Sequence, residues 1–437
     1  MSATPPSYVA RPGARVAGEI SVPGDKSISH RAAMLGAIAN GITEIQGFLE
    51  GADCLATLAA VAALGVRIER PSARHVLIHG AGMRGLRAAT TPLDFGNSGT
   101  GMRLLAGLLC GQPFDSILIG DASLMRRPME RVAAPLRRMG ADIRTHDGQP
   151  PLAIAGGRAL HGCDHRLELP SAQVKSAILL AGLYANGRTT VREPGLSRDH
   201  TEQMLEDFGV AVARQGEALS ITGPATPAAT RIDVPGDFSS AAFFIVAGLI
   251  AGQAPLVIRG VGVNPTRTAA LDILRLMGAD IRLHPVDSRG SEPVADIEVR
   301  PGALRGITVP PELVPIAMDE WPVLFAAAAV AAGETVVSGA GELRVKESDR
   351  LAAMAEGLAA VGVAADPLPD GLRVRGGRVA GGEVDCRGDH RIAMAFAVLA
   401  ARAQSPIVVR GVQNVATSFP GFAATARAAG LQLEEGG

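Results

Sequence analysis

The sequence predicts an α/β protein of two domains, each built from three copies of one repeat. Three features support this prediction: a helix-and-strand segment that recurs six times, a small-residue helix that recurs in the same order, and a duplicated Val-Pro-Gly-Asp sequence. At roughly 100–200 residues per domain, 437 residues correspond to about two to four domains. Hydrophobic residues make up 47% of the chain, which is enough to fill large cores.

The first recurring segment is an amphipathic helix that stops at a glycine and is followed by a short strand. Residues 136–148 (LRRMGADIRTHDG) and 274–285 (LRLMGADIRLHP) are near copies, and weaker copies recur at intervals of about 70 residues. The aligned glycines are Gly65, Gly140, Gly209, Gly278, Gly362 and Gly430. A glycine just past a helix readily takes the left-handed conformation that ends it. Six repeats are therefore predicted.

The second recurring segment is a polar turn, a helix of small apolar residues and a strand. Its copies span residues 22–47, 93–120, 169–191, 234–260, 318–339 and 386–411. Helices of Ala, Gly and Leu with almost no charge are typically buried on all sides. The longest apolar runs, 241–252 and 321–332, are shorter than the roughly 18–20 residues of a membrane span. We expect buried helices there and no membrane association.

The duplicated sequence VPGD, at residues 22–25 and 234–237, predicts where the chain crosses between domains. The first domain would comprise residues 1–22 and 238–437, so that the N-terminal strand joins the C-terminal half. The second domain would comprise residues 23–237.

Composition excludes several classes of function. The formal net charge is −1 and aromatic residues are 3%, which disfavours nucleic-acid binding through a basic face or a stacking surface. The four cysteines, at 54, 110, 163 and 386, have neither CxxC nor zinc spacing. No signal-peptide pattern occurs in residues 1–18. We expect a cytoplasmic, reduced protein without a metal site.

Lysine is rare in this chain and its positions are informative. Of 42 basic residues only Lys26, Lys175 and Lys346 are lysines. A lysine kept in an arginine-rich chain indicates a place where a compact ammonium is needed; random survival is the alternative. All of them lie in polar segments, which weakens that alternative.

Polar residues crowd into the turn before each small-residue helix. Helix capping explains Ser, Thr, Asp and Asn at such positions. It does not explain cations in the first turn, because positive charge there opposes the helix dipole. Those cations are Lys26, Arg31, Lys175 and Arg391. Cations beside helix N-termini predict an anionic ligand.

Further segments fit the same chemistry. GNSGTGMR (96–103) lacks the endings of a nucleotide P-loop and of a dinucleotide loop, so an anion cradle and a plain tight turn remain. MRRPMERV (125–132) supplies either a clamp for an anion or a solvated arginine face. RVKESDR (344–350) would place Lys346 and Arg350 on one side of a helix, with a salt-bridged surface helix as the alternative.

These segments occur in a recognisable order. GDKSISHR, LDFGNSGTGMR, RRPM, SAQVKSA, MDEWP, RVKESDR, GDHRIAM and ATSFP follow one another along nearly the whole chain. Together the sequence resembles the 5-enolpyruvylshikimate-3-phosphate (EPSP) synthase family, the 3-phosphoshikimate 1-carboxyvinyltransferases. The resemblance implies a two-domain inside-out α/β barrel, each domain with three βαβαββ units, and an active site in the cleft between the domains.

The resemblance also implies an activity. Members of this family transfer the enolpyruvyl group of phosphoenolpyruvate to the 5-hydroxyl of shikimate 3-phosphate and release inorganic phosphate through a tetrahedral ketal phosphate. The reaction belongs to the shikimate pathway, which leads to chorismate and the aromatic amino acids, and glyphosate targets it. The resemblance implies small-molecule substrates only, no cofactor, no metal and a monomer.

The resemblance assigns roles by position. For shikimate 3-phosphate it implies Lys26, Ser27, Arg31, Ser171, Gln173, Arg198, Asp319 and Lys346. For phosphoenolpyruvate it implies Lys26, Asn97, Gly99, Arg127, Gln173, Lys346, Arg350 and Arg391. Asp319 and Glu347 would be the acid/base pair, with Asp319 acting on the 5-hydroxyl and Glu347 on the methylene carbon; Lys26 could also move a proton.

The sequence departs from parts of the family pattern. Thr417 stands where some members have a lysine, and Glu342 where some have Asn, so the anion cage could hold one cation fewer. Lys175 occurs in a subset of the family, without a role that the resemblance implies. Some herbicide-tolerant members have alanine at the position of Gly99, so we expect this chain to admit glyphosate.

Two other interpretations stay open. A UDP-N-acetylglucosamine enolpyruvyltransferase would share the fold but typically has a reactive cysteine in a mobile loop. Here Cys54 and Cys110 lie in apolar runs and are expected to be buried. A non-catalytic repeat protein that binds phosphorylated ligands would need the cations but no acid/base pair.

Overall fold

The computed structural model describes residues 6–436 and divides into two compact units. Unit 1 comprises Met1–Pro23, Pro235–Asp287 and Pro293–Gly437, and unit 2 comprises Gly24–Val234 and Ser288–Glu292. The chain therefore leaves unit 1 after Pro23 and returns after Val234, within the two copies of Val-Pro-Gly-Asp.

Unit 1 alternates helices with short strands. Its helices are α7 (Phe238–Ala251), α8 (Ala269–Leu276), α9 (Trp321–Ala328), α10 (Arg350–Ala360), α11 (His390–Leu399) and α12 (Phe422–Ala428). Its strands are β1 (Ser7–Arg11), β2 (Val16–Ser21), β15 (Gly252–Gly262), β16 (Asp280–Val286), β17 (Val294–Arg300), β18 (Glu334–Val337), β19 (Ala364–Leu368), β20 (Gly371–Arg375), β21 (Gly382–Asp385), β22 (Ile407–Arg410) and β23 (Gln432–Gly436). Their sheets have the orders β16-β17-β15-β2, β18-β20-β19 and β21-β22-β1-β23.

Unit 2 repeats this arrangement. Its helices are α1 (Lys26–Ile38), α2 (Ala52–Ala63), α3 (Gly99–Leu109), α4 (Glu130–Arg138), α5 (Ala172–Gly182) and α6 (His200–Asp207). Its strands are β3 (Asn40–Gln46), β4 (Arg67–Ser72), β5 (His75–Ala81), β6 (Leu93–Asp94), β7 (Ser116–Ile119), β8 (Asp142–His146), β9 (Gln149–Ala155), β10 (Asp164–Arg166), β11 (Gly187–Arg192), β12 (Ala213–Gln215), β13 (Ala218–Gly223) and β14 (Arg231–Asp233). Their sheets have the orders β14-β3-β5-β4, β6-β7-β9-β8 and β10-β11-β13-β12.

The sheets share one pairing pattern. In every four-stranded sheet of residues 6–436, one edge strand runs parallel to its neighbour and the other pairs are antiparallel. In the three-stranded sheet, an isolated parallel bridge from Thr308 to Val336 lies on the outer side of β18. The predicted mixed α/β class is confirmed as a set of small mixed sheets.

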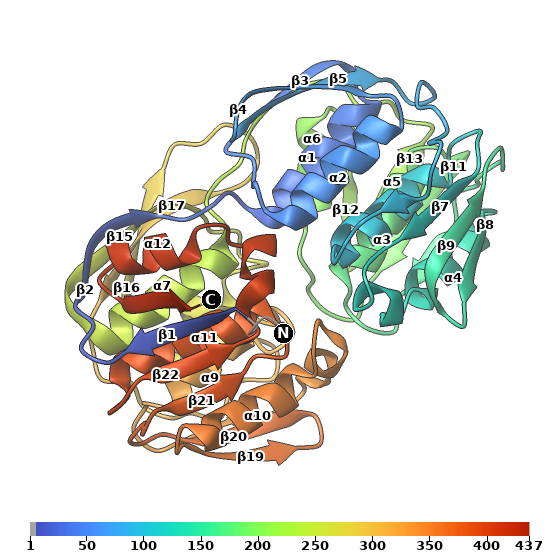
Figure 1. The fold of residues 1–437 in the computed structure, drawn as a ribbon. Coiled ribbons are helices and arrows are strands. Elements are labelled where there is room, and N and C mark those ends of the chain that lie inside the picture. The colour runs from blue at the N-terminus through green and yellow to red at the C-terminus, as the bar shows by residue number, and fades with distance from the viewer. Residues whose placement is uncertain (1–5, 437) are drawn as a thin grey trace, which may run out of the picture. The chain divides into compact units, whose positions relative to one another are not determined.

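The N-terminal strands pair with the C-terminal half of the chain. β1 lies between β22 and β23, so that the dark blue start of the chain runs beside its red end in Figure 1. β2 pairs in parallel with β15. Strands β1 and β2 thus complete two sheets of unit 1 rather than forming a sheet of their own.

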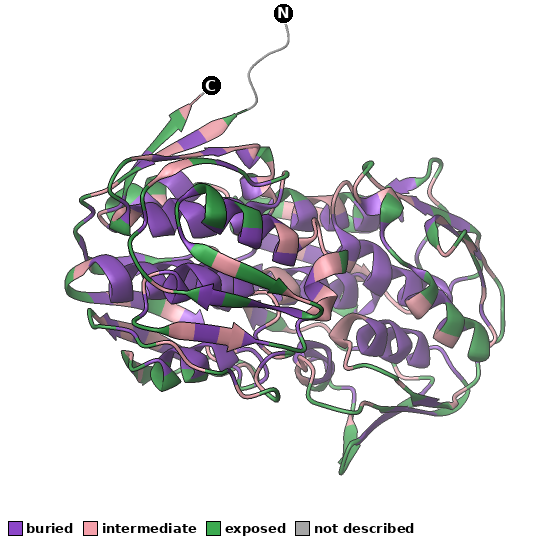
Figure 2. Cartoon of the chain, turned by 90° about the horizontal axis from the view of Figure 1, so that it is seen from below, coloured by how far each residue is buried: buried purple, intermediate pink, exposed green. Residues whose placement is uncertain are grey.

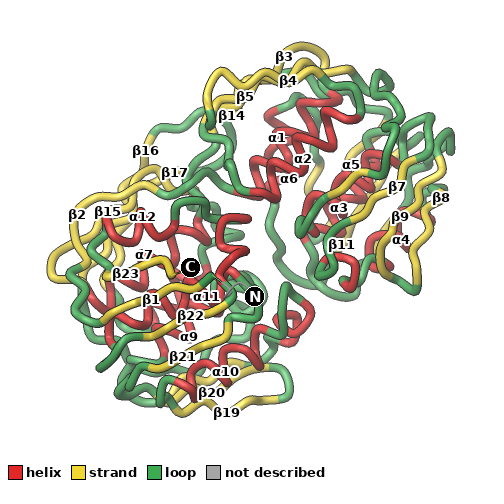
Figure 3. The backbone as a smooth tube through the Cα atoms, viewed as in Figure 1, coloured by secondary structure: helices red, strands yellow, loops and turns green. Residues whose placement is uncertain are grey.

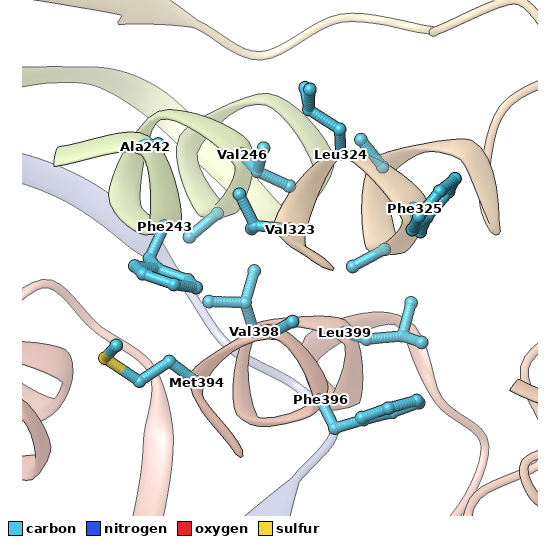
Figure 4. Packing of buried hydrophobic residues seen from close by; sticks show 14 of the residues in the cluster. Ala242, Phe243, Val246, Val323, Leu324, Phe325, Met394, Phe396, Val398 and Leu399 are labelled. Atoms are coloured by element: carbon cyan, nitrogen blue, oxygen red, sulfur yellow. The ribbon is translucent and has the colours of Figure 1, made fainter. Parts of the chain in front are cut away.

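Each unit has its own hydrophobic core. In unit 1, α7, α9 and α11 contact one another, and Figure 4 shows side chains such as Val246, Val323 and Val398 meeting at their centre. All residues of α7 and of α9 are buried, as the apolar runs predicted. Figure 2 shows the same concentration of buried residues in helices of both units. No helix within residues 6–436 combines the length and apolar character needed to cross a membrane.

Strands cover these helices and alternate buried with partly exposed residues. β17 alternates strictly, with Ala295, Ile297 and Val299 buried. Such alternation places one face of a sheet against the core and the other toward solvent. The strands accordingly lie along the outside of each unit in Figure 3, with helices behind them.

The predicted glycine stops are confirmed. Each repeat glycine lies two residues beyond the end of α2, α4, α6, α8, α10 or α12. Their φ angles lie between 79° and 101°, the left-handed region where a side chain is strained. The repeat seen in the sequence is therefore a repeat of helix ends.

Candidate active site

The polar turns before the small-residue helices are helix N-termini, as predicted. Side chains of Asp25, Ser98, Ser171, Asp237 and Asp389 cap α1, α3, α5, α7 and α11. The distances are short: Ile28 N lies 2.8 Å from Asp25 Oδ1, and Ser240 N lies 2.8 Å from Asp237 Oδ1. Helix capping therefore explains why Asp and Ser occupy these positions. It does not explain the cations beside them.

In unit 2, the first two turns of α1 carry Lys26, Ser27 and Arg31. Lys26 Nζ forms an ion pair with Asp53 of α2. The Arg31 guanidinium is buried; its Nε donates to Thr201 Oγ1 at 2.6 Å and its Nη2 to Ser176 Oγ at 2.8 Å. Arg31 thereby connects α1 with α5 and α6.

Arginine side chains surround the N-terminus of α3. Asn97 Oδ1 accepts from Arg127 Nη2 at 2.6 Å, and Asn97 Nδ2 donates to Asp121 Oδ2 at 2.8 Å. A Cβ added at Gly99 would lie 3.1 Å from Arg127 Nη1 and 3.2 Å from Arg103 Nη1. Arg127 is buried, so it is not part of a solvated arginine face. Guanidinium groups at a helix N-terminus favour the anion cradle over a plain turn.

Gln173 connects this cradle to α5. Its Oε1 accepts from Arg103 Nη1 at 2.7 Å, and its Nε2 donates to Thr100 Oγ1 at 2.8 Å. Ser171, the N-cap of α5, lies two residues earlier, and Arg198 lies just before α6. Sequence reasoning missed Arg103, although it closes the GNSGTGMR segment as its only charged residue.

His30 is a second residue that sequence reasoning missed. Its Nδ1 lies 2.8 Å from Thr57 Oγ1 of α2, and its Nε2 lies 3.4 Å from Ser98 Oγ at the start of α3. Burial, with Lys26 and Arg31 adding to it, holds the pKa of His30 well below its ordinary value. The ring is therefore a neutral link between α1, α2 and α3.

In unit 1, arginines converge on Asp319. Asp319 carboxylate oxygens lie 3.6 Å from Arg350 Nη1, 3.8 Å from Arg391 Nη2 and 3.9 Å from Arg267 Nη1. Arg391 Nη1 also donates to the Asp319 carbonyl at 2.9 Å. Arg267, which is buried, donates to Ser239 Oγ at 2.9 Å. Sequence reasoning missed Arg267, whose only signal is a polar NPTR turn after a strand.

The prediction of a helix through residues 344–350 is wrong. A 3-10 helix, η2 (Gly341–Val345), ends before Lys346, which is extended, and α10 begins only at Arg350. The reason is Asp349, which caps α10 by accepting from Ala352 N at 3.0 Å. Lys346 and Arg350 are therefore not one turn apart on a helix.

Arg350 is also not part of a salt-bridged surface helix. It is buried, and its Nη2 lies 2.7 Å from Glu347 Oε2 while its Nε lies 2.8 Å from Asp389 Oδ2. One guanidinium thus joins Glu347, Asp389 and, at longer range, Asp319. Burial lowers the pKa of the nearby Lys346, against the attraction of Asp319.

Comparison with known proteins bears on this arrangement. The model of the family "EPSP synthase (3-phosphoshikimate 1-carboxyvinyltransferase)" matches residues 10–425. The chain belongs to the EPSP synthase family. The resemblance drawn from the ordered motifs is therefore confirmed, and with it the expected transferase activity in the shikimate pathway.

Individual relatives agree along the whole length. A 3-phosphoshikimate 1-carboxyvinyltransferase of Methylococcus capsulatus is 56% identical, and the match covers 98% of each chain. One of Xanthomonas axonopodis pv. citri is 54% identical over 100% of each chain. A solved EPSP synthase from Acinetobacter baumannii has a TM-score of 0.89 at 49% identity, covering 99% of this chain and 100% of that one. The enolpyruvyl transferase NikO from Streptomyces tendae, 18% identical with a TM-score of 0.77, shares the fold.

Both departures from the EPSP synthase pattern lie in 3-10 helices. Thr417 Oγ1 donates to Asn414 O at 2.7 Å within a 3-10 helix, η4 (Val412–Thr417), so the hydroxyl is used at the helix end. Glu342 lies in η2.

Cys54 and Cys110 are buried, as their apolar runs predicted, and burial raises the pKa of Cys110 to about 12. Neither is a reactive loop thiol of the kind a UDP-N-acetylglucosamine enolpyruvyltransferase would use. Within residues 6–436, no cluster of His, Cys, Asp and Glu could hold a metal ion.

Proposed function

We propose that this member of the EPSP synthase family transfers the enolpyruvyl group of phosphoenolpyruvate to the 5-hydroxyl of shikimate 3-phosphate through a tetrahedral ketal phosphate. The observation that carries the residue assignment is the Arg350 guanidinium, which holds Glu347 and approaches Asp319. Two carboxylates organised by fixed cations provide acid and base where anionic substrates must be bound.

Unit 2 would supply most of the anion binding. We propose that shikimate 3-phosphate is held by Lys26, Ser27, Arg31, Ser171, Gln173 and Arg198, with Asp319 and Lys346 from unit 1. Arg31, Ser171 and Gln173 are supported by their positions at or near the starts of α1 and α5. Phosphoenolpyruvate would be held by Lys26, Asn97, Gly99, Arg127, Gln173, Lys346, Arg350 and Arg391. The guanidinium groups at the N-terminus of α3 support this second assignment.

The reaction needs two proton movements. Asp319 would remove the proton of the 5-hydroxyl as its oxygen bonds to C2 of phosphoenolpyruvate, while Glu347 delivers a proton to the methylene carbon. The resulting ketal phosphate then loses inorganic phosphate and a methyl proton, which restores the double bond. Fixed arginines would stabilise the carboxylate and phosphate charges throughout, without reorganising at the moment of reaction. Lys26, next to the capped start of α1, could also carry a proton.

The finer architecture is part of the same proposal. We propose that each unit is an inside-out α/β barrel of three βαβαββ units, with domains at residues 1–22 with 238–437 and at 23–237. The shared strand order of the sheets and the recurrent helix pairs support it. We also propose that the protein is a cytoplasmic monomer, and light scattering on the purified protein would test the oligomeric state.

Phosphate release from purified protein tests the activity, with each substrate omitted in turn. We expect release only when both substrates are present, and a loss of about 10²–10⁴-fold in Glu347→Gln, since general acid catalysis contributes that much. Lys26→Ala should also abolish release. Arg410→Ala, which breaks an exposed ion pair with Glu383, is the matched control and should stay active.

Two outcomes would contradict the proposal. Tight binding of shikimate 3-phosphate without phosphate release would favour the non-catalytic phospho-ligand protein. Release only with UDP-N-acetylglucosamine as acceptor would favour the sister enolpyruvyltransferase.

A further inference from the structure

Lys175 lies at the centre of a buried ion cluster in unit 2. Its Nζ is 2.8 Å from Glu193 Oε2 and 2.8 Å from Glu202 Oε1. The three side chains are all at most 10% exposed. Lys175 is on α5, Glu193 follows β11 and Glu202 is on α6, so one ammonium joins three segments.

The Glu193 side of the cluster reaches the start of α5. Glu193 Oε1 accepts from the backbone N of Ser171 at 2.8 Å, and Glu193 Oε2 accepts from Ser197 Oγ at 2.7 Å. Ser171 caps α5, and Ser197 is next to Arg198. The carboxylate thus holds the Ser171 backbone and the Ser197 side chain, in two segments that carry proposed ligands of shikimate 3-phosphate.

The Glu202 side of the cluster reaches Arg31. Thr201, its neighbour on α6, accepts from Arg31 Nε at 2.6 Å, and Thr201 Oγ1 lies 2.6 Å from Ser176 Oγ. Ser176 follows Lys175 on α5. Lys175 therefore sets the spacing of α5 and α6, on which the position of the Arg31 guanidinium depends.

The charges argue against a direct role in binding phosphate. Burial opposes the positive charge of Lys175, but Glu202 and Glu193 outweigh it and raise its pKa. One buried ammonium faces two carboxylates, and Glu202 Oε2 has no hydrogen-bond partner among the described residues. A cation already shared by two acids attracts a further anion poorly. Without the Lys175 ammonium, Glu193 and Glu202 would repel each other in a medium of low dielectric.

We propose that Lys175 is a positioning residue for the shikimate 3-phosphate site, which it serves by holding Glu193 and Glu202 together. The proposal rests on the proposed function of Ser171, Gln173, Arg198 and Arg31. It also explains a lysine in an arginine-rich chain: a compact ammonium fits between two carboxylates, whereas a planar guanidinium needs more room and a forked geometry.

Lys175→Met tests the proposal, with binding of shikimate 3-phosphate measured by titration calorimetry alongside steady-state kinetics. We expect the Kd and KM for shikimate 3-phosphate to rise about 10–100-fold, the effect of misplaced binding groups. The KM for phosphoenolpyruvate should change far less. The double variant Lys175→Met/Glu202→Gln should recover part of the affinity, because it removes the repulsion between the acids.

Tyr184→Phe is the matched control. It breaks a buried hydrogen bond of 2.8 Å to Gln112 just after α5, so it should lower stability and leave shikimate 3-phosphate affinity unchanged. If Lys175→Met fails to fold, Lys175→Arg keeps the charge and should still raise the KM for shikimate 3-phosphate selectively.

Wild-type affinity in a folded Lys175→Met, or equal increases in the KM of both substrates, would overturn the proposal. In either case the wild-type protein would still release phosphate, so the proposed function would stand. Failure of the proposed function would instead appear as a wild-type protein that releases no phosphate.

Discussion

At the scale of single residues, arginines pair with acids at the proposed site positions Asp319, Glu347, Arg350 and Arg391 of unit 1. Arg350 is the clearest case, because its buried guanidinium donates hydrogen bonds to both Glu347 and Asp389. Burial alone would raise the pKa of Asp389, but Arg350 overrides that effect and holds it below its usual range. Arg350 thereby keeps Asp389 ionised in a place where burial favours the neutral form.

Gly99 gives a prediction at this scale. We expect Gly99→Ala to remain folded but to bind glyphosate and phosphoenolpyruvate more weakly, because the new methyl would lie 3.1 Å from Arg127 Nη1 and 3.2 Å from Arg103 Nη1. Both atoms are ends of flexible side chains, so they can move away from the new methyl. That movement would displace the guanidinium groups from the anion cradle. Inhibition curves for wild type and variant measure this. A strongly tolerant wild type, with inhibition unchanged in Gly99→Ala, would contradict it.

At the scale of elements, each repeat contains two helices, one marked by a polar cap at its start and the other by a glycine at its end. The small-residue helices begin with a polar cap and are buried, whereas the second helix of each repeat ends at a glycine of positive φ. Caps and stops are local, which is why the sequence displays them so clearly.

Two of these glycines can be compared within unit 1. Gly278→Ala should cost about 1–2 kcal/mol for left-handed backbone alone, because its Cβ would lie no closer than 3.6 Å to Ala303 O. Gly430→Ala should cost clearly more, because its Cβ would lie 2.1 Å from Arg15 O. Urea unfolding of both variants checks the order. Equal losses would mean that conformation, not space, selects glycine at both ends.

His30 gives a pH-dependent prediction for α1, α2 and α3. Above pH 6.5 the ring is neutral in the folded and unfolded states, so its contribution to stability is complete. Below that pH the unfolded chain binds a proton that the folded ring does not, because burial, Lys26 and Arg31 lower the folded pKa. The free energy of unfolding should therefore fall by about 1.4 kcal/mol per pH unit from this group.

Urea unfolding at pH 7.5 and 5.5 measures that contribution. His30→Asn should lose less stability between these pH values than wild type does. His146→Asn changes an exposed ring and serves as the control. If His30→Asn shows the full wild-type pH dependence, another group is responsible; buried His165, whose pKa burial lowers to about 4, would be the next one to test.

At the scale of the whole molecule, each unit buries its own core. The longest helix of unit 1, α7, is buried throughout, and in unit 2 most of α3 is buried. Domains with separate cores commonly unfold as separate cooperative units, which breaks two-state behaviour.

Scanning calorimetry tests this separation. We expect the calorimetric enthalpy to exceed the van't Hoff enthalpy, and Leu399→Ala in unit 1 and Leu105→Ala in unit 2 to destabilise different transitions. Both leucines are buried, so each truncation should cost about 2–5 kcal/mol. One transition that both variants shift equally would show that the units unfold together.

The sequence by itself determined the α/β class, the repeat, the helix starts and ends and the family, because caps, glycine stops and motifs are properties of consecutive residues. The sequence did not reveal Arg103, Arg267, His30 or the partners of Lys175, and it misjudged the segment before Arg350. Only the tertiary structure decided these, because Arg267 meets Asp319, and Lys175 meets Glu202, across separate segments. The energies of these ion pairs depend on burial and on which charges folding brings together. Neither can be predicted from a pattern of consecutive residues.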